Sequence, residues 1–508
     1  MSIRLAQARA LHYSRGLVWL RRDLRAHDHA ALYHALKSCD QVFVAFALDS
    51  AILETLPRSD RRVEFILASL RDVDSALRSM AQAVQIPNAE QVQLIVRHGQ
   101  ATQELPKLAA ALGVQAVFCS REYEPAAISR DKLVRGALAQ AGIMLHHFKD
   151  QVLFERGELL TPQGKAPTGF AAYERAWRLG LQPDALKPYP CASLAQHLAS
   201  VPTALQQPLP QLHDIDFLPS NLAALKIPTG SSGAAQMLDY FLPHLDSYLE
   251  RADYPARRGV SYLGIHLRFG SLSIRQAVAP AWALAQQGHA GAAAWLGGLV
   301  RHDFYAQLLA LRPDLAKGKS YKREFEHIAW EKGARTKKIF AAWCSGNTGY
   351  PLIDAAMRQL NYSGYMHPRL RLMSASFFCK HLGLDWRRGA AYFAEKLSDY
   401  DLASNNGGWQ WAAGSGSDAQ PSFRIFNPVQ QSQKYDPDGR FIRRYVPELA
   451  QLDLPHLHAP WLADALELQA CGLRLGNKAG DHYPLPIVDQ HEAVAKTKQR
   501  YAVIKEKP

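Results

Sequence analysis

Short apolar runs alternate with longer amphipathic stretches through the first 150 residues of the chain. Runs of strand length occupy residues 16–20, 41–48, 92–96, 116–120 and 143–148. Between several of them apolar residues recur with the helical period, notably over residues 61–83 and 126–141. This alternation predicts an α/β domain with a parallel, doubly wound sheet over residues 14–150. Neither G-x-G-x-x-G nor G-x-x-x-x-G-K-[ST] occurs there, so the ordinary dinucleotide and P-loop fingerprints are absent.

The pattern changes twice further along the chain. Eight prolines lie between Pro183 and Pro228, with few long periodic runs, which predicts an inter-domain linker over residues 151–234. From residue 235 to 490 helical periodicity dominates, and we expect an all-α domain followed by a charged tail over residues 491–508. Its clearest periodic stretches cover residues 233–252, 273–287, 292–310, 351–360, 370–382 and 389–397.

Composition is that of an ordinary globular protein, with 48% hydrophobic and 21% charged residues. A membrane span needs about 18 consecutive uncharged apolar residues, and no such run occurs. The first 15 residues lack an apolar core, so we expect no secretory signal. Six scattered cysteines without a C-x-x-C motif argue against zinc ribbons, iron–sulfur clusters and a disulfide framework, and they favour the reducing cytoplasm.

The chain is basic, with 59 Lys and Arg against 46 Asp and Glu and a formal net charge of +13. Such a charge favours a polyanionic partner, nucleic acid before membrane, although it is equally explained as a means of solubility. Basic residues are dense between residues 317 and 338, and further ones such as Arg369 add to a possible rim for phosphate contacts. Taken singly, each of these charges is as well explained by a solvated surface.

Polar chemistry concentrates between residues 343 and 449. Asp399, Asp401 and Asn405 cluster just before Gly407-Gly408, which we interpret as a turn that brings backbone close to another group. Arg371 stands two residues after Arg369. Carboxylates, amides and arginines beside aromatic residues suit a planar heterocycle that carries sugar and phosphate, but they also suit a polar network that caps buried helix ends.

Long motifs in this stretch resemble the flavin domain of the photolyase/cryptochrome family, closest to class I cyclobutane pyrimidine dimer photolyases. They are W-x-x-G-x-T-G-Y-P-x-I-D-A-A-M-R-Q-L-N from Trp343, N-N-G-G-W-Q-W from Asn405 and F-R-I-F-N-P from Phe423. Residues 18–28 resemble the opening strand and loop of the same family's antenna domain. The resemblance covers roughly residues 14 to 490 and implies a Rossmann-like α/β antenna domain, a linker and a helical domain that holds FAD.

The resemblance assigns flavin contacts residue by residue. Tyr248, Ser261, Leu263 and the turn at residues 270–273 resemble the segment that binds the FAD phosphates, a role that suits backbone N–H groups at helix starts. Val260 and Gly264 replace a usual Thr and Ser there. Near the isoalloxazine, the resembling residues are the Arg371 and Asp399 ion pair, Asp401 at the polar edge and Asn405 facing N5.

Three tryptophans resemble the family's electron relay from flavin to surface. Trp409 and Trp386 match its first two members, and Trp330 is the candidate for the third. Trp330 lies 13 residues before Trp343, where the family usually has about ten, so a short insertion is inferred. Without the resemblance, core packing is the favoured explanation of each tryptophan, and the resemblance reverses this for Trp386 and Trp409 only.

The substrate helix departs from the pattern W-x-N-E-L-x-W-R-E-F of dimer photolyases. Gly298 stands where that pattern has the Glu that bonds the dimer, and Arg301 stands where it has a base-stacking Trp. Pro368 replaces a usual Asn, whereas Trp411, which matches another base-contacting Trp, is kept. Each glycine inside a helix lowers helix stability by about 1 kcal/mol relative to Ala. A glycine at position 298 therefore suggests that the cavity needs the space that a side chain would fill. The alternative is neutral drift.

The resemblance therefore implies light-driven repair of UV-damaged DNA, in which reduced FAD donates an electron to a flipped pyrimidine dimer. The altered cavity residues favour an alternative, a cryptochrome-like blue-light photoreceptor or a photolyase for a different lesion. Residues 60–64 resemble a segment of relatives that bind a flavin or deazaflavin, so a second antenna chromophore of unknown identity is possible. We expect a monomer that uses no metal.

Overall fold

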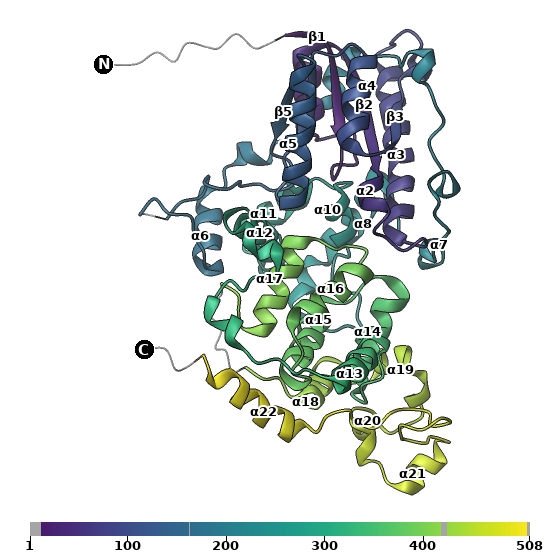
Figure 1. Cartoon of the computed structure of the whole chain (residues 1–508), viewed down its shortest axis with the longest axis vertical. Coiled ribbons are helices and arrows are strands. Elements are labelled where there is room, and N and C mark those ends of the chain that lie inside the picture. The colour runs from purple at the N-terminus through teal and green to yellow at the C-terminus, as the bar shows by residue number, and fades with distance from the viewer. Residues whose placement is uncertain (1–11, 162, 418–423, 505–508) are drawn as a thin grey trace. The chain divides into compact units, whose positions relative to one another are not determined.

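The chain forms two compact units, each described here by itself (Figure 1). The computed structural model describes residues 12–161, 163–417 and 424–504; most of the first 15 residues and Phe423 of the F-R-I-F-N-P motif lie outside them. The first unit comprises Met1–Glu155, Leu181–Tyr240 and Tyr262–Pro280. The second comprises Arg156–Gly180, Phe241–Ser261 and Ala281–Pro508.

A five-stranded parallel sheet lies at the centre of the first unit, in the order β3-β2-β1-β4-β5. Val18 on the central strand stands opposite Val44 on one side and Phe118 on the other. Every predicted apolar run has become a strand, which confirms the predicted α/β class. The strands are β1 (Tyr13–Leu20), β2 (Cys39–Asp49), β3 (Leu94–Gly99), β4 (Ala116–Ser120) and β5 (Met144–Phe148).

Helices and 3-10 turns complete the first unit and bury both faces of the sheet. Asp60 caps the longest helix, whose bounds match the predicted stretch, by accepting a hydrogen bond from the backbone N–H of Arg62. The elements are α1 (Ala30–Ser38), α2 (Ser50–Leu53), α3 (Arg61–Ala83), η1 (Ala89–Gln91), α4 (Ala101–Ala111), α5 (Pro125–Gln140), η2 (Pro183–Leu186), η3 (Cys191–His197), η4 (Thr203–Leu205), η5 (Leu212–Ile215), α7 (Leu222–Leu225), α8 (Gly230–Phe241) as far as Tyr240, α10 (Gly264–Phe269) and α11 (Ile274–Gln286) as far as Pro280.

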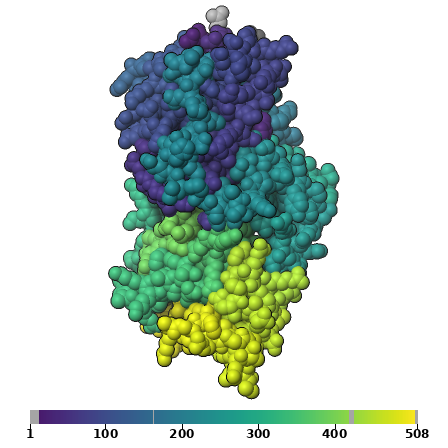
Figure 2. Space-filling view, turned by 90° about the vertical axis from the view of Figure 1, so that its right-hand side faces the viewer, coloured from purple at the N-terminus to yellow at the C-terminus, as the bar shows by residue number. Residues whose placement is uncertain are grey.

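The predicted linker is not a simple connector. Its proline-rich part, from η2 to α7, runs as a teal strip over the surface of the first unit (Figure 2). Its earlier part contains α6 (Phe170–Gly180), a helix of the second unit that buries Tyr173 and Trp177. The expectation of few long periodic runs concerns Pro183–Pro228, and it agrees with the short elements η2 to α7 there. No helix is predicted from the sequence at α6, because a single helix with two buried aromatic residues gives only a short periodic signal.

The second unit is helical, as predicted. Its elements are η6 (Leu242–Ser247), α9 (Tyr248–Arg251), α12 (Ala290–Leu311), η7 (Pro313–Lys317), η8 (Arg323–His327), α13 (Ala334–Ser345), α14 (Pro351–Ser363), α15 (Pro368–Ser376), η9 (Phe377–His381), α16 (Trp386–Lys396), α17 (Leu402–Ala413), α18 (Pro428–Tyr435), α19 (Arg440–Tyr445), η10 (Pro447–Leu449), α20 (Leu454–Leu457), η11 (Pro460–Leu462), α21 (Ala465–Ala470) and α22 (Gln490–Ala502).

Two of the predicted helical stretches are interrupted. Residues 233–252 divide into α8, η6 and α9, because Pro243 lacks the backbone N–H that a continuous helix needs. Residues 370–382 divide into α15 and the π-helical turn η9. None of the helices in the described part of the chain has the length and hydropathy that a membrane crossing requires.

Candidate functional site

The main cavity of the second unit has a volume of about 1140 Å³. Its walls come from α6, α12, α15, α16 and α17 and from the segment between the last two helices. Most of the predicted site residues meet here, although they are spread over more than a hundred positions of the chain. The predicted residues on its wall are Gly298, Arg301, Pro368, Arg371, Asp399, Asp401, Asn405, Trp409 and Trp411.

The predicted ion pair of Arg371 and Asp399 is present on this wall. The N-cap His367 and Pro368 begin α15, which places Arg371 one turn into the helix. The Arg371 Nη2 donates to Asp399 Oδ2 at 2.7 Å, and its Nε donates to the carbonyl of Met366 at 2.8 Å. Burial disfavours the charged guanidinium, but Asp399 outweighs it and raises the pKa of Arg371. The pair therefore holds a charged arginine at the cavity.

Asp401 and Asn405 are positioned by the start of α17. Asp401 is the N-cap of this helix, and its carboxylate accepts a hydrogen bond from the backbone N–H of Ser404 at 2.8 Å. One turn later, Asn405 Nδ2 donates to the carbonyl of Ala390 on α16 at 3.1 Å. Because this bond engages the amide NH₂, the Asn405 side chain retains its oxygen as an acceptor at the cavity wall.

Gly407 and Gly408 lie inside α17, so their interpretation as a turn is wrong. The expected close approach is present at Gly407, where a Cβ would collide with the ring of Tyr305 on α12. A Cβ at Gly408, which lines the cavity, would meet no heavy atom within 4 Å. The first glycine lets two helices pack, and the second widens the cavity.

The substrate helix α12 contributes the altered positions. A Cβ at Gly298 would meet no heavy atom within 4 Å, so the missing Glu leaves open space. The guanidinium of Arg301 lies over the ring of Phe170, 3.8 Å from its centroid. Arg301 therefore forms a cation–π pair with α6 on the cavity wall, at the place of the family's tryptophan.

This cavity fits a flavin. Its volume of about 1140 Å³ is slightly above the range of about 300–1,000 Å³ that is typical of ligand sites, which suits a large cofactor. Two buried polar atoms on its wall residues, Asp399 Oδ1 and Trp409 Nε1, have no hydrogen-bond partner among the described residues. Buried polar groups are normally satisfied, so a bound heterocycle with donor and acceptor edges accounts for both atoms. Arg371, Asp399, Asp401 and Asn405 would hold its isoalloxazine.

The three predicted relay tryptophans differ in their burial and in their relation to the cavity. Trp409 lines the cavity, Trp386 is buried in the same hydrophobic cluster, and Trp330 is half-buried at the edge of that cluster. The structure adds Trp343, whose fully buried ring lies edge-on to Trp409 with centroids 6.1 Å apart. In the sequence, Trp343 is recognisable only as part of a motif, because a buried neighbour on another helix leaves no local signal.

The other predicted residues do not line this cavity. Tyr248 begins α9, and burial raises the pKa of its hydroxyl. Ser261 ends a segment of the second unit, whereas Leu263, the N-cap of α10, and the 270–273 turn belong to the first. Arg369 donates instead to Asp253 at 2.6 Å.

The antenna segment is engaged within its own unit. Arg62 forms an ion pair with Asp60 at 2.5 Å, and Arg61 Nε donates to the side chain of Asn221 at 2.6 Å. Glu64 accepts hydrogen bonds from the backbone N–H and the hydroxyl of Ser220. These contacts fasten α3 to the proline-rich segment of the first unit.

Sequence reasoning missed the contribution of α6 to the cavity wall, made by Phe170, Ala171 and Ala172. It also missed Tyr305 and Phe393, which line the cavity from α12 and α16. For α6 the signal was the spacing of Phe170, Tyr173 and Trp177, which falls on one helical face.

Family models match both ends of the chain. Residues 295–503 match the family model for the FAD-binding domain of DNA photolyase, and residues 16–193 match the model for DNA photolyase. The chain is 37% identical over 456 residues to the deoxyribodipyrimidine photo-lyase of Vibrio cholerae, which covers 89% of this chain and 94% of that protein.

Solved structures extend the likeness to the fold. A bacterial class III photolyase from Agrobacterium tumefaciens aligns with a TM-score of 0.84 and 30% identity, over 100% of both chains. A Synechocystis cryptochrome aligns with a TM-score of 0.81 and 26% identity, over 96% of this chain and 99% of that one. With these matches over nearly its whole length, the chain belongs to the photolyase/cryptochrome family.

Proposed function

We propose that this protein is a light-driven DNA repair enzyme that splits pyrimidine dimers, as the name of its relatives states for them. The observation that carries the proposal is a single cavity with two kinds of wall. Arg371, Asp399 and Asn405 supply ion-pair and amide groups for a flavin, and Trp411 supplies an aromatic face for a flipped base. Bound FAD would supply light absorption and the electron that opens the dimer.

The protein's own residues position and tune the cofactor. Asp399 keeps Arg371 charged, so a cation stands beside the place where negative charge develops on reduction. Asn405 would offer its amide oxygen to the flavin N–H at N5, because its NH₂ group is engaged by Ala390. Gly408 leaves room for the ring, since no side chain projects from that turn of α17.

Trp409, Trp386 and Trp330 would carry electrons to the cofactor. Their arrangement supports this role, because it proceeds from the cavity wall through the buried core to a half-buried residue. Tyr248, Ser261 and Leu263 remain our proposed phosphate contacts. A second chromophore near residues 60–64 also remains a prediction.

DNA would bind to the basic residues between positions 317 and 338. Arg323 in this stretch pairs with Asp314, whereas the exposed Lys317 and Lys338 have no carboxylate partner in the described part of the chain. Unpaired lysines suit contacts with backbone phosphates.

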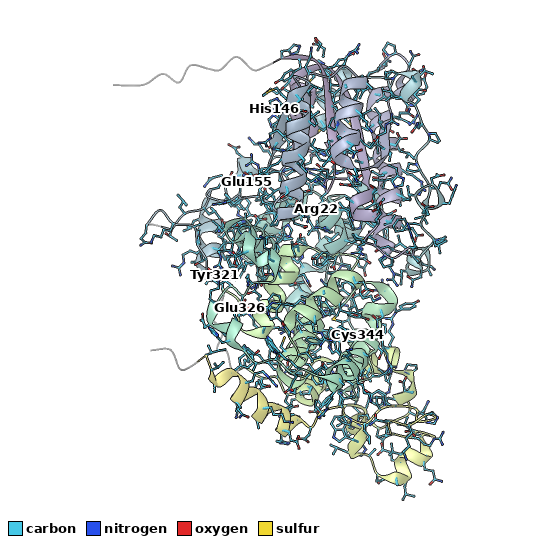
Figure 3. The ribbon with its side chains drawn as sticks, viewed as in Figure 1. Arg22, His146, Glu155, Tyr321, Glu326 and Cys344 are labelled. Carbon is cyan, nitrogen blue, oxygen red and sulfur yellow. The ribbon has the colours of Figure 1, made fainter. Side chains whose placement is uncertain are left out.

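All six cysteines are free thiols, including the half-buried Cys344 of α13 (Figure 3), which supports a reducing compartment such as the cytoplasm.

A second candidate is a cryptochrome-like photoreceptor or a photolyase for another lesion. The observation in its favour is the set of Gly298, Arg301 and Pro368, which together remove a carboxylate, an indole and an amide from the substrate side of the cavity. Each lost hydrogen bond or stacked base is worth about 1–3 kcal/mol, so recognition of a cyclobutane dimer would have to come from other groups.

The deciding experiment is repair of an oligonucleotide that carries one thymine dimer. The purified protein is reduced anaerobically, mixed with the oligonucleotide and exposed to blue light, with a dark sample as the control. Light-dependent loss of the dimer supports the repair enzyme. Absence of repair by a protein whose flavin photoreduces normally would reject it in favour of the second candidate.

A further inference from the structure

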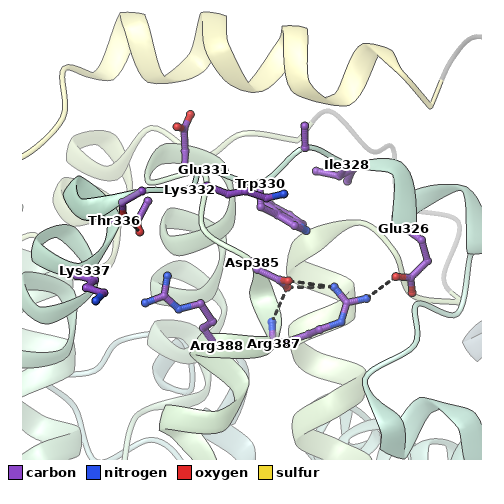
Figure 4. A pocket seen from close by; sticks show the side chains of 12 residues that line it. Glu326, Ile328, Trp330, Glu331, Lys332, Thr336, Lys337, Asp385, Arg387 and Arg388 are labelled. Atoms are coloured by element: carbon purple, nitrogen blue, oxygen red, sulfur yellow. Dashed lines mark hydrogen bonds and ion pairs between the residues drawn. The ribbon is translucent and has the colours of Figure 1, made fainter.

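A second pocket, of about 660 Å³, lies in the helical unit beside Trp330 (Figure 4). Its walls come from the segment between η8 and α13, the first turn of α13 and the start of α16. Glu326, labelled in Figure 3, stands at one end of it. No part of the proposed repair chemistry uses this pocket except Trp330 itself.

The wall that carries Trp330 is tied down on both sides. Glu331 donates its backbone N–H to the carbonyl of Gly383 at 2.9 Å. Arg500 of α22 donates to the carbonyl of Ala329 at 3.1 Å and pairs with the Glu331 carboxylate at 2.5 Å. The Trp330 ring lies edge-on to Tyr501, with centroids 6.3 Å apart. These contacts hold the indole in place at the pocket.

The pocket has an excess of positive charge. Four cationic side chains line it against three carboxylates, and each carboxylate is ion-paired: Asp385 and Glu326 with the one Arg387, at 3.1 and 2.8 Å, and Glu331 with Arg500 of α22. Lys332 and Lys337 are exposed and have no carboxylate partner among the described residues. Arg388 also lines the pocket, and its guanidinium faces a ring, that of Phe340, 4.5 Å from the centroid. The site is therefore suited to an anionic ligand, whose charged groups would lie at Lys332 and Lys337.

The same pocket reaches the outer end of the proposed relay. Trp330 lines it directly, and Arg387, which lines it from α16, lies over the Trp386 ring at 5.0 Å from the centroid. A ligand held here would contact the half-buried tryptophan at which an electron would enter. An aromatic wall beside unpaired lysines favours a planar molecule that carries phosphates.

We propose that this pocket binds a reduced nicotinamide dinucleotide phosphate and delivers its electrons to Trp330. The inference rests on the proposed function, because it supplies the reductant that the light-driven chemistry requires. Lys332 and Lys337 would bind the phosphates, and the nicotinamide would lie against the Trp330 indole. A volume of about 660 Å³ is within the usual range for a ligand of this class.

The electron balance is complete with this donor. Light removes one electron from the relay toward the flavin and leaves a cation radical on Trp330. The nicotinamide returns one electron to that indole, and a second excitation takes the second electron. Over the two transfers NADPH and FAD become NADP⁺ and FADH⁻, so the hydrogen lost from the nicotinamide is accounted for by one proton on the flavin and no other oxidant is needed.

The first test is binding in the dark, which needs no photochemistry. Calorimetric titration of the purified protein with NADP⁺ should show one site. Its affinity should fall roughly tenfold when Lys332→Gln and Lys337→Gln are combined, because two charge-assisted contacts are lost. Lys338→Gln, an exposed neighbour that does not line the pocket, is the matched control and should leave the affinity unchanged. Absence of binding, or equal loss in the control, would overturn the proposal.

The second test separates this inference from the proposed function. Under blue light, NADPH should reduce the flavin at a lower concentration than uncharged dithiothreitol does. In the variant that combines Lys332→Gln and Lys337→Gln, the NADPH concentration needed should rise to that of dithiothreitol, whereas the rate of reduction by dithiothreitol should not change. If dithiothreitol works and NADPH has no advantage, the pocket is not a donor site. If neither NADPH nor dithiothreitol reduces the flavin under light, the proposed electron relay is rejected. The nucleotide site is then accepted or rejected by the dark titration alone.

DNA is the competing occupant of these lysines. An undamaged single-stranded oligonucleotide is therefore added to the dark titration. The proposal expects NADP⁺ affinity to be unchanged by the oligonucleotide. It also expects the double variant to keep most of its oligonucleotide binding, because the other basic residues of positions 317–338 remain. Competition, together with weaker DNA binding by the variant, would assign Lys332 and Lys337 to DNA and reject the nucleotide site.

Discussion

Gly407 of α17 lies so close to Tyr305 of α12 that a Cβ on the glycine would overlap the edge of the tyrosine ring. The two helices pack directly against each other at this point. Both also line the cavity, α12 with Gly298 and Arg301 and α17 with Asn405. The distance between the flavin side and the substrate side of the cavity therefore depends on the absence of one methyl group.

Gly407→Ala should disrupt this contact. Overpacking costs typically about 1–3 kcal/mol of unfolding free energy, which exceeds the gain of about 1 kcal/mol from the better helix propensity of Ala. Gly408→Ala is the matched control, because its Cβ would project into open space and should leave stability equal or higher. Denaturant unfolding of the two variants measures the difference. Equal stability of both would show that Tyr305 moves aside freely.

The ion pair of Arg371 and Asp399 should be needed for cofactor retention. Asp399→Asn keeps the size of the side chain but leaves Arg371 without its counter-charge beside the cavity, so we expect the purified protein to lose most of its flavin and about 1–3 kcal/mol of stability. The measurement is the flavin absorbance relative to protein absorbance, together with unfolding of both proteins.

A second ion pair on the same helix provides the control. Arg369 pairs with Asp253 at 2.6 Å, but half of the Asp253 side chain is exposed. Exposed pairs are worth about 0–1 kcal/mol, so Asp253→Asn should retain flavin. Equal flavin loss in both variants would mean that general weakening of α15, rather than the cavity charge, releases the cofactor.

Acid should destabilise the protein partly through His381. Burial, assisted by the neighbouring Lys380, lowers the pKa of this histidine to about 4, and neither ring nitrogen has a hydrogen-bond partner among the described residues. In the unfolded chain the same histidine takes up a proton near its ordinary value of 6.5. The unfolded state therefore binds more protons between these two values, and stability falls as the pH is lowered through this window.

His381→Phe should remove that part of the pH dependence, because phenylalanine can keep the stacking on Phe377 but cannot be protonated. Relative to wild type, the variant should gain about 1.4 kcal/mol for each pH unit between pH 6.5 and 4. Unfolding is measured at several pH values, with exposed His491→Phe as the control. A constant difference between His381→Phe and wild type at all pH values would contradict the titration.

The electron path should run outward through Trp386 and not through Trp343. Trp343 contacts Trp409 but is fully buried. If Trp343 gave an electron to Trp409, no reductant in solution could reach the oxidised Trp343 to reduce it again. Trp386→Phe should therefore bring flavin photoreduction close to background, whereas Trp343→Phe should leave most of the rate. Time-resolved absorption after a light pulse measures both. The opposite result would place Trp343 in the relay.

The strands and most helices could be predicted from periodicity, since burial on a sheet face or along one helix stripe repeats in the sequence. Asp399 and Arg371 could be assigned to the flavin only through the family resemblance, because the pattern of polar residues alone favoured helix capping. The wall contributed by Phe170 and the contact of Tyr305 with Gly407 could not be predicted. They depend on packing between helices far apart in the chain, and no local spacing records which residues meet.

The open space at Gly298 allows the strongest test of substrate recognition. Gly298→Glu places a carboxylate where no heavy atom lies within 4 Å of the new Cβ, so it should be accommodated without a clash. Arg301→Trp exchanges the cation over Phe170 for a stacking face. One hydrogen bond and one stacked base are each worth about 1–3 kcal/mol, so the double variant should bind a thymine-dimer oligonucleotide at least about tenfold more tightly than wild type.

Gly298→Gln with Arg301→Trp is the control for the carboxylate, because it fills the same space without the charge. Dark binding and repair per absorbed photon are measured side by side. If neither rises, Gly298 and Arg301 do not limit dimer recognition, and the cavity recognises a dimer through other wall residues or accepts a different ligand.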